Sequence, residues 1–102
     1  MRKIIGVFIV AIIAIMLVSN HVFAEVQVCK EWSYLYDQVM YERQQGLHKD
    51  AALMDVDHPH IKDVIKDAYT YPIAESTMGK FNIIDEFVKK WFERCMYIMQ
   101  NN

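Results

Sequence analysis

FNIIDEFVKKWFERCMYIM, residues 81–99, carries apolar side chains that recur at alternating intervals of three and four. This spacing is typical of one face of an amphipathic helix. The positions are Phe81, Ile84, Val88, Trp91, Cys95 and Ile98, and Phe87, Phe92 and Met99 widen the same face. Ser76 or Thr77 precedes the pattern and can cap the helix, which we expect to run to about Met99.

A second long helix is predicted over residues 26–45. Its apolar side chains again follow helical spacing, and charged residues cover the opposite side. The apolar positions are Cys29, Trp32, Tyr36, Val39 and Met40. Gly46 follows, where a left-handed C-terminal cap is expected.

Two shorter helical segments are predicted between these long ones. Residues 50–54 are expected to form a short helical turn. Asp57-His58-Pro59 marks the start of a further helix. Proline has a helical φ at the first position of the helix, and the side chain of Asp57 or His58 can cap the helix N-terminus. An apolar stripe continues to Tyr69, and Tyr71-Pro72 is expected to end it. No segment alternates with period two, so we predict an all-α bundle of about four helices, two long and two short.

The first 24 residues have the three parts of a secretory signal peptide. Arg2 and Lys3 precede an uncharged apolar run, Ile4–Val18, and Ala24 provides a small residue for cleavage. An uncleaved anchor is the alternative, although the run is shorter than the roughly 20 apolar residues that cross a bilayer. We therefore expect residues 25–102 to form one domain, secreted across the inner membrane into the periplasm.

Export gives the two cysteines a structural role. Cys29 and Cys95 allow a single pairing, and neither has a second cysteine close enough for a redox motif or a zinc knuckle. Each lies on the apolar face of its helix. An up-and-down bundle would bring the start of the first helix beside the end of the last. The sequence therefore predicts that one disulfide closes the bundle.

Charge and motifs exclude several function classes. Without Arg2 and Lys3, nine basic residues remain against thirteen acidic ones, a net charge of −4. This balance argues against nucleic acid, and against a membrane once the leader is cleaved. There is no serine–histidine–acid set, free-thiol nucleophile or glycine-rich phosphate loop. We expect that the protein is not an enzyme and that it binds no cofactor.

A cluster of metal-ligating residue types precedes the third predicted helix. Asp55, Asp57, His58 and His60 offer oxygen and imidazole donors within six residues, with His48 as a further donor. The spacing matches no dedicated metal site, and a helix start rich in Asp needs no metal to explain it. We favour capping over metal binding. The histidines would also gain charge below pH about 6.5.

Arg43 is a polar residue on the apolar face of the first long helix. We expect a structural role, in which the guanidinium reaches helix-terminal carbonyls or a carboxylate such as Asp63 or Asp67. A cation near a helix C-terminus is also favoured by the helix dipole. The alternative is an anion-binding residue in a cleft.

Four large side chains fall among charged residues and form the candidate protein-binding surface. These are Tyr34, Tyr41, Ile83 and Tyr97. Scattered exposed apolar residues are ordinary. Aromatic residues at helical spacing on a polar face can instead mark an interface. We interpret them as a contact surface for an unknown periplasmic protein, or for a second copy, since monomer and homodimer both remain open.

The chain resembles a diffuse group of small exported helical proteins of Gram-negative bacteria, most of them uncharacterised. The shared residues are Cys29, Arg43-x-x-Gly46, Ala68-Tyr69, Pro72, Phe87 and Cys95. The resemblance implies a periplasmic, disulfide-closed bundle and transfers no catalytic residue. HdeA-like acid-stress chaperones and the immunity proteins of type VI secretion share the general design.

The leading hypothesis is thus a non-enzymatic interaction module. The alternatives are an acid-stress chaperone, an immunity protein against a secreted effector, and a small-ligand or metal carrier.

Overall fold

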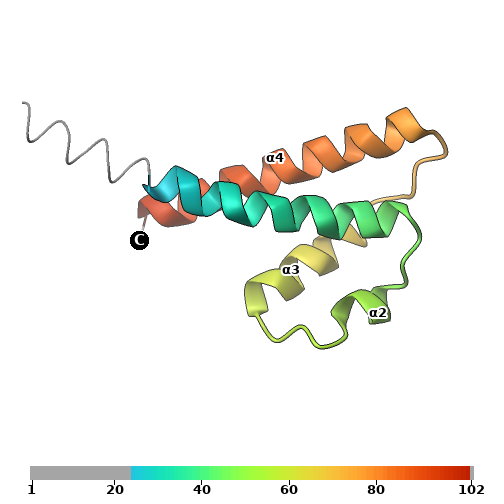
Figure 1. Ribbon diagram of the computed structural model, residues 1–102, viewed down its shortest axis with the longest axis horizontal. Coiled ribbons are helices and arrows are strands. Elements are labelled where there is room, and N and C mark those ends of the chain that lie inside the picture. The colour runs from blue at the N-terminus through green and yellow to red at the C-terminus, as the bar shows by residue number, and fades with distance from the viewer. Residues whose placement is uncertain (1–23, 102) are drawn as a thin grey trace, which may run out of the picture.

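Two long antiparallel helices form the frame of the molecule (Figure 1). The computed structural model describes residues 24–101, and the predicted leader lies outside these residues apart from Ala24. Within this range there are four helices and no strand. They are the helix of residues 24–44, α2 (Lys49–Leu53), α3 (Pro59–Ala68) and α4 (Thr77–Asn101). The predicted all-α bundle of two long and two short helices is confirmed.

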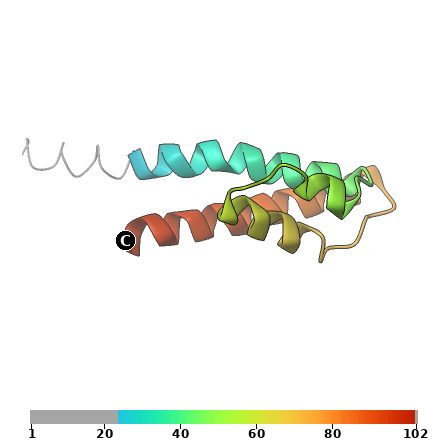
Figure 2. The same ribbon diagram turned by 90° about the horizontal axis from the view of Figure 1, so that it is seen from below.

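The disulfide joins the two long helices at one end of the frame. Cys29 and Cys95 are bonded, with their Cα atoms 5.7 Å apart. The described part of the chain therefore starts and finishes at the same end, and the connections from the 24–44 helix to α2 and from α3 to α4 lie towards the other (Figures 1 and 2). The predicted pairing is confirmed. Among residues 24–101, no helix is both long and apolar enough to cross a membrane.

Gly46 ends the 24–44 helix as predicted. Its φ of +89° is left-handed, which costs glycine little because it has no Cβ. The Gly46 amide donates to the Arg43 carbonyl and the Leu47 amide to the Glu42 carbonyl, each at 3.0 Å. This is the Schellman pattern of a helix C-terminus. It turns the chain towards α2.

Side-chain caps begin the other helices. The imidazoles of His48 and His58 accept hydrogen bonds from backbone amides at the starts of α2 and α3. Ser76 caps α4 by accepting from the Gly79 amide at 3.0 Å. The predicted end of the third helix is wrong by a few residues. It ends at Ala68 with Tyr69 as its cap, and a turn fills the space before Pro72.

The core lies where α3 packs across the two long helices. Its buried side chains are Tyr36, Val39, Met40, Val64, Ile65, Ala68, Ile84, Phe87 and Trp91. The predicted apolar face of α4 is only partly buried, because Phe81 and Ile98 at its two ends are exposed. Ten residues of α3 span about 15 Å, while the 25 residues of α4 span more than twice that. A short helix cannot cover both ends of a long stripe.

Candidate functional site

The structure exposes three of the four residues predicted to form a binding surface. Tyr34, Tyr41 and Tyr97 are 68%, 46% and 69% exposed. Ile83 is half-buried and packs against the core, so the structure does not place it with the three exposed tyrosines. The reason is its place one turn before Phe87, on the side of α4 that faces the 69–72 turn.

The side of the two long helices opposite α2 and α3 is uncovered (Figures 1 and 2). Contacts to α3 and the following turn come from Trp32, Tyr36, Lys90 and Trp91, which define the covered side. Helical spacing from the disulfide places another set of apolar side chains, exposed or half-buried, on the opposite side. We call this set the open face: Val26, Tyr34, Tyr41, Phe81, Phe92 and Met96.

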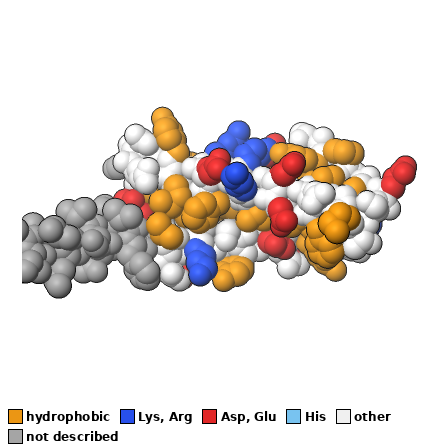
Figure 3. All heavy atoms as spheres, turned by 90° about the horizontal axis from the view of Figure 1, so that it is seen from above, with side chains coloured by type: hydrophobic (Ala, Val, Ile, Leu, Met, Phe, Trp, Pro, Cys, Tyr) orange, Lys and Arg blue, Asp and Glu red, His pale blue; other side chains and the backbone are white. Residues whose placement is uncertain are grey.

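Charged side chains are interspersed along the open face. Figure 3 looks onto it and shows apolar groups separated by basic and acidic ones. Lys30 lies beside the disulfide, Lys89 at the middle of α4, and Asp37 and Asp85 further towards the loops, and all four are exposed. Tyr97 is two residues from Cys95, so it points away from the 24–44 helix and does not join this face.

An apolar cleft of about 250 Å³ lies at the disulfide end. Both long helices and the start of α3 contribute to it. Its lining residues are Val28, Trp32, His60, Cys95, Ile98 and Met99. The only ionisable side chain among them is His60. From the sequence we expected the cysteines and aromatic residues of this region to belong to the core, and no sequence pattern indicated a cleft.

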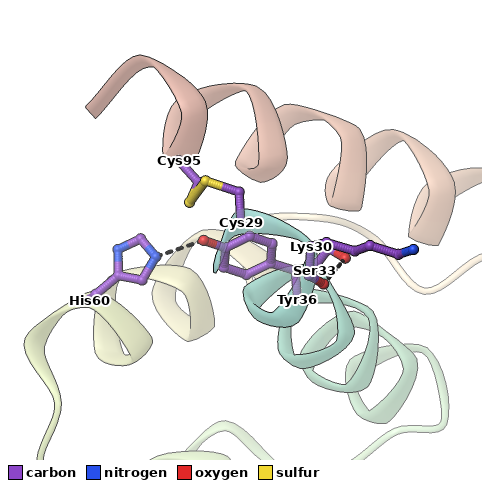
Figure 4. The surroundings of a disulfide bond; sticks show 6 residues. All are labelled: Cys29, Lys30, Ser33, Tyr36, His60 and Cys95. Carbon is purple, nitrogen blue, oxygen red and sulfur yellow. Dashed lines mark hydrogen bonds between the residues drawn. A yellow bond between two sulfur atoms is a disulfide. The ribbon is translucent and has the colours of Figure 1, made fainter. Parts of the chain in front are cut away.

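His60 connects α3 to the long helices through a hydrogen bond and ring contacts. Its Nε2 lies 2.8 Å from the Tyr36 hydroxyl, as Figure 4 shows below the disulfide. Its ring centroid is 5.1 Å from that of Trp32 and 5.6 Å from that of Trp91. Burial lowers the pKa of His60, as does nearby His58, and Asp63 opposes them only in part. Burial also raises the pKa of Tyr36 to about 12.

The predicted Asp/His cluster does not converge on a metal position. Among residues 24–101, no group of three or more His, Cys, Asp or Glu side chains is placed to hold a metal ion. His58 Nδ1 accepts from the His60 amide at 3.2 Å, which confirms the capping interpretation. Asp55 takes a left-handed φ of +61° in the turn before α3. Asp57 is exposed.

Arg43 takes the structural role expected of it, with a backbone partner. Its Nε and one terminal nitrogen donate to the Tyr71 carbonyl at 3.2 and 3.0 Å, and the guanidinium carbon lies 4.9 Å from the Tyr69 ring centroid. Neither Asp63 nor Asp67 pairs with it. Asp67 instead accepts from the Trp91 indole at 2.8 Å and forms an ion pair with Lys90.

The Asp67–Lys90 pair is an interaction that the sequence did not reveal. Burial lowers the pKa of Lys90, but hydrogen bonds to Asp67 and Tyr71 and the Asp67 charge outweigh it, so the net pKa is raised. Both partners belong to amphipathic helices on which charged residues usually face water. No spacing rule relates residues that are 23 positions apart in different helices.

Comparisons of the chain with protein families, with curated proteins and with solved structures find no match.

Proposed function

We propose that the chain is an exported, non-enzymatic protein-interaction module that binds a partner protein through the open face. The observation that supports this most directly is the exposure of Tyr34 and Tyr41 on a helix pair that α2 and α3 cover on one side only. Large aromatic side chains supply contact area at a low entropic cost. A disulfide between long helices fits an oxidising compartment and a rigid binding surface.

The charges of the open face suggest the chemistry of the partner. Lys30 favours an acidic side chain at the disulfide end, and Asp37 and Asp85 favour basic ones towards the loops. The apolar groups between them favour a helix with an apolar stripe. We expect a helical surface with an apolar centre and opposite charges at its two ends. An immunity protein bound to its effector would be one instance.

Site-specific crosslinking tests the proposal. A photoreactive amino acid would replace Tyr34 or Tyr41 in bacteria that export the protein. Tyr97, which lies off the face and is as exposed as Tyr34, would serve as the control. We expect adducts from the first two positions only. Charge reversal by Lys30→Glu in the Tyr34 variant should reduce the adduct severalfold, because it removes attraction to the partner.

Equal adducts from Tyr97, or no adduct from either open-face position, would contradict the proposal. An adduct with a second copy of the chain would show that the open face forms a homodimer and does not bind a different protein. Adducts that are insensitive to Lys30→Glu would count against the charge pattern.

The acid-stress chaperone is a second candidate, and His60 is the observation that favours it. Its imidazole is half-buried between α3 and the long helices, so protonation would weaken their contact. Client aggregation measured at pH 7 and pH 3, with and without the protein, tests this function. Protection at low pH alone would favour it, and equal aggregation in both samples at pH 3 would exclude it.

A further inference from the structure

We infer that the cleft at the disulfide end is a binding site for a small apolar molecule, a single aromatic ring that carries a hydrogen-bond acceptor. The cleft does not depend on the open face, so this inference is independent of the proposed function. Its basis is the size of the cleft, the fixed position of its walls and one unused ring nitrogen.

The size of the cleft suits one ring. Its volume is about 250 Å³, whereas an apolar cavity of roughly 150 Å³ admits benzene. Pockets for drug-sized molecules begin at about 300 Å³. A ring with one short substituent would therefore fill the cleft. Val28, Ile98 and Met99 would surround the ring with aliphatic groups, and Trp32 offers an aromatic face.

The walls of the cleft are held in place without a ligand. The Cys29–Cys95 bond ties the two long helices together beside it. The Trp32 ring lies 5.3 Å from the ring of His58 and 5.1 Å from that of His60. The His60 ring is in turn fixed by the Tyr36 hydroxyl. A preformed site binds with little additional ordering of side chains.

One nitrogen of His60 supplies the polar contact. His60 Nε2 is the hydrogen-bond partner of the buried Tyr36 hydroxyl, and we assign the hydroxyl as the donor and the neutral imidazole as the acceptor. The ring hydrogen is then on Nδ1. Figure 4 shows this nitrogen on the side of the ring away from Tyr36. The described residues provide no acceptor for the Nδ1 hydrogen, so an acceptor on the ligand would receive it.

Titration followed by NMR tests the site. The probes are p-cresol, whose hydroxyl oxygen can accept, and toluene, which has the same ring and methyl group without an acceptor. At pH 7.5 we expect saturable shifts of the Val28 and Ile98 methyl groups with a Kd on the order of 0.1–1 mM for p-cresol. Toluene should bind roughly tenfold more weakly, the effect of one hydrogen bond.

Two matched substitutions decide where binding occurs. Ile98→Trp would fill the cleft and should abolish the saturable shifts of the Val28 methyl groups, the readout that this variant retains. Ile73→Trp adds the same side chain at an exposed position outside the cleft and should leave them unchanged. Helical circular dichroism of both variants checks that they fold, and Ile98 is itself exposed enough to tolerate the change.

Undiminished binding to the Ile98→Trp variant, or the absence of saturable shifts with either probe, would overturn the inference. Shifts confined to the open face would do the same. Equal affinity for p-cresol and toluene would overturn the role of His60. Methyl shifts produced by a partner protein and blocked by Ile98→Trp would identify a partner side chain as the occupant instead.

Discussion

At the scale of single residues, Gln44 shows how one polar side chain fixes a loop. Its amide nitrogen donates to the Pro72 carbonyl and its oxygen accepts from the Ala74 amide, each at 2.9 Å. The side chain is almost fully buried. These two bonds attach the segment before α4 to the end of the 24–44 helix. Removing the buried amide would take away both bonds at once, at part-buried positions where water replaces them only incompletely.

We therefore expect Gln44→Leu to lower the free energy of unfolding by about 2 kcal/mol. The neighbouring Gln45 is exposed, so Gln45→Leu is a matched control and should change stability by less than about 0.5 kcal/mol. Urea unfolding followed by tryptophan fluorescence measures both. Equal effects of the two substitutions would show that the bonds to Pro72 and Ala74 do not stabilise the fold.

The same residue marks a limit of sequence-based prediction. A glutamine in the last turn of a helix is typical of a solvated end, and its partners lie 28 and 30 positions away. Arg43 was more predictable, because a long cation on an apolar stripe needs an acceptor nearby. That acceptor could not be chosen from the sequence, since carboxylates and free carbonyls satisfy a guanidinium equally well.

At the scale of elements, the attachment of α3 depends on the charge of His60. The pKa of this imidazole is lowered in the folded protein, mainly by burial, whereas an unfolded chain has the ordinary value near 6.5. At pH values between the folded and the unfolded pKa of His60, the unfolded state binds more protons than the folded state. The contribution of His60 to stability is therefore complete above pH 6.5 and is lost as pH falls through this window.

The expected result is a fall in the free energy of unfolding between pH 7.5 and pH 5, with a smaller fall in His60→Gln. The neutral amide can hydrogen-bond to Tyr36 but does not titrate. Urea titrations at several pH values measure the difference. Lys62→Gln, a control at an exposed position on the same helix, should retain the full pH dependence. Identical pH profiles for the native protein and His60→Gln would rule out this role.

Element boundaries followed closely from local signals. Gly46, Pro59 and Ser76 each have a backbone or capping preference that acts within a few residues, and the structure places helix ends beside all three. The candidate sites depended on distant contacts and were less predictable. Ile83 occupies a polar helix face in the sequence, and its packing against the core depends on how the helices are arranged.

At the scale of the whole molecule, the disulfide is expected to supply much of the stability. It closes a loop between positions that are 66 apart in sequence. Constraining the unfolded chain over this length stabilises the folded state by roughly 4 kcal/mol in the chain-entropy account. Small domains have total stabilities of about 5–15 kcal/mol.

Cys29→Ala/Cys95→Ala should therefore unfold at a much lower urea concentration than the native protein. Reducing agent should destabilise the native protein by a similar amount and leave the double variant unchanged. Urea unfolding with and without reductant checks both statements. A double variant as stable as the native protein would mean that packing of α3 alone holds the long helices together.

The position of the disulfide also determines how the molecule responds to mechanical force. The bond lies near the shared end at which the described chain begins and finishes, so tension applied at residues 24 and 101 passes directly through the two sulfur atoms. Only the short stretches outside Cys29 and Cys95 can extend. The segment between the two cysteines, which are 66 positions apart, would stretch to roughly 220–240 Å as free chain and remains shielded from the load. A thiol reductant would release this hidden length, so the protein can transmit tension without unravelling only while its cysteines stay oxidised.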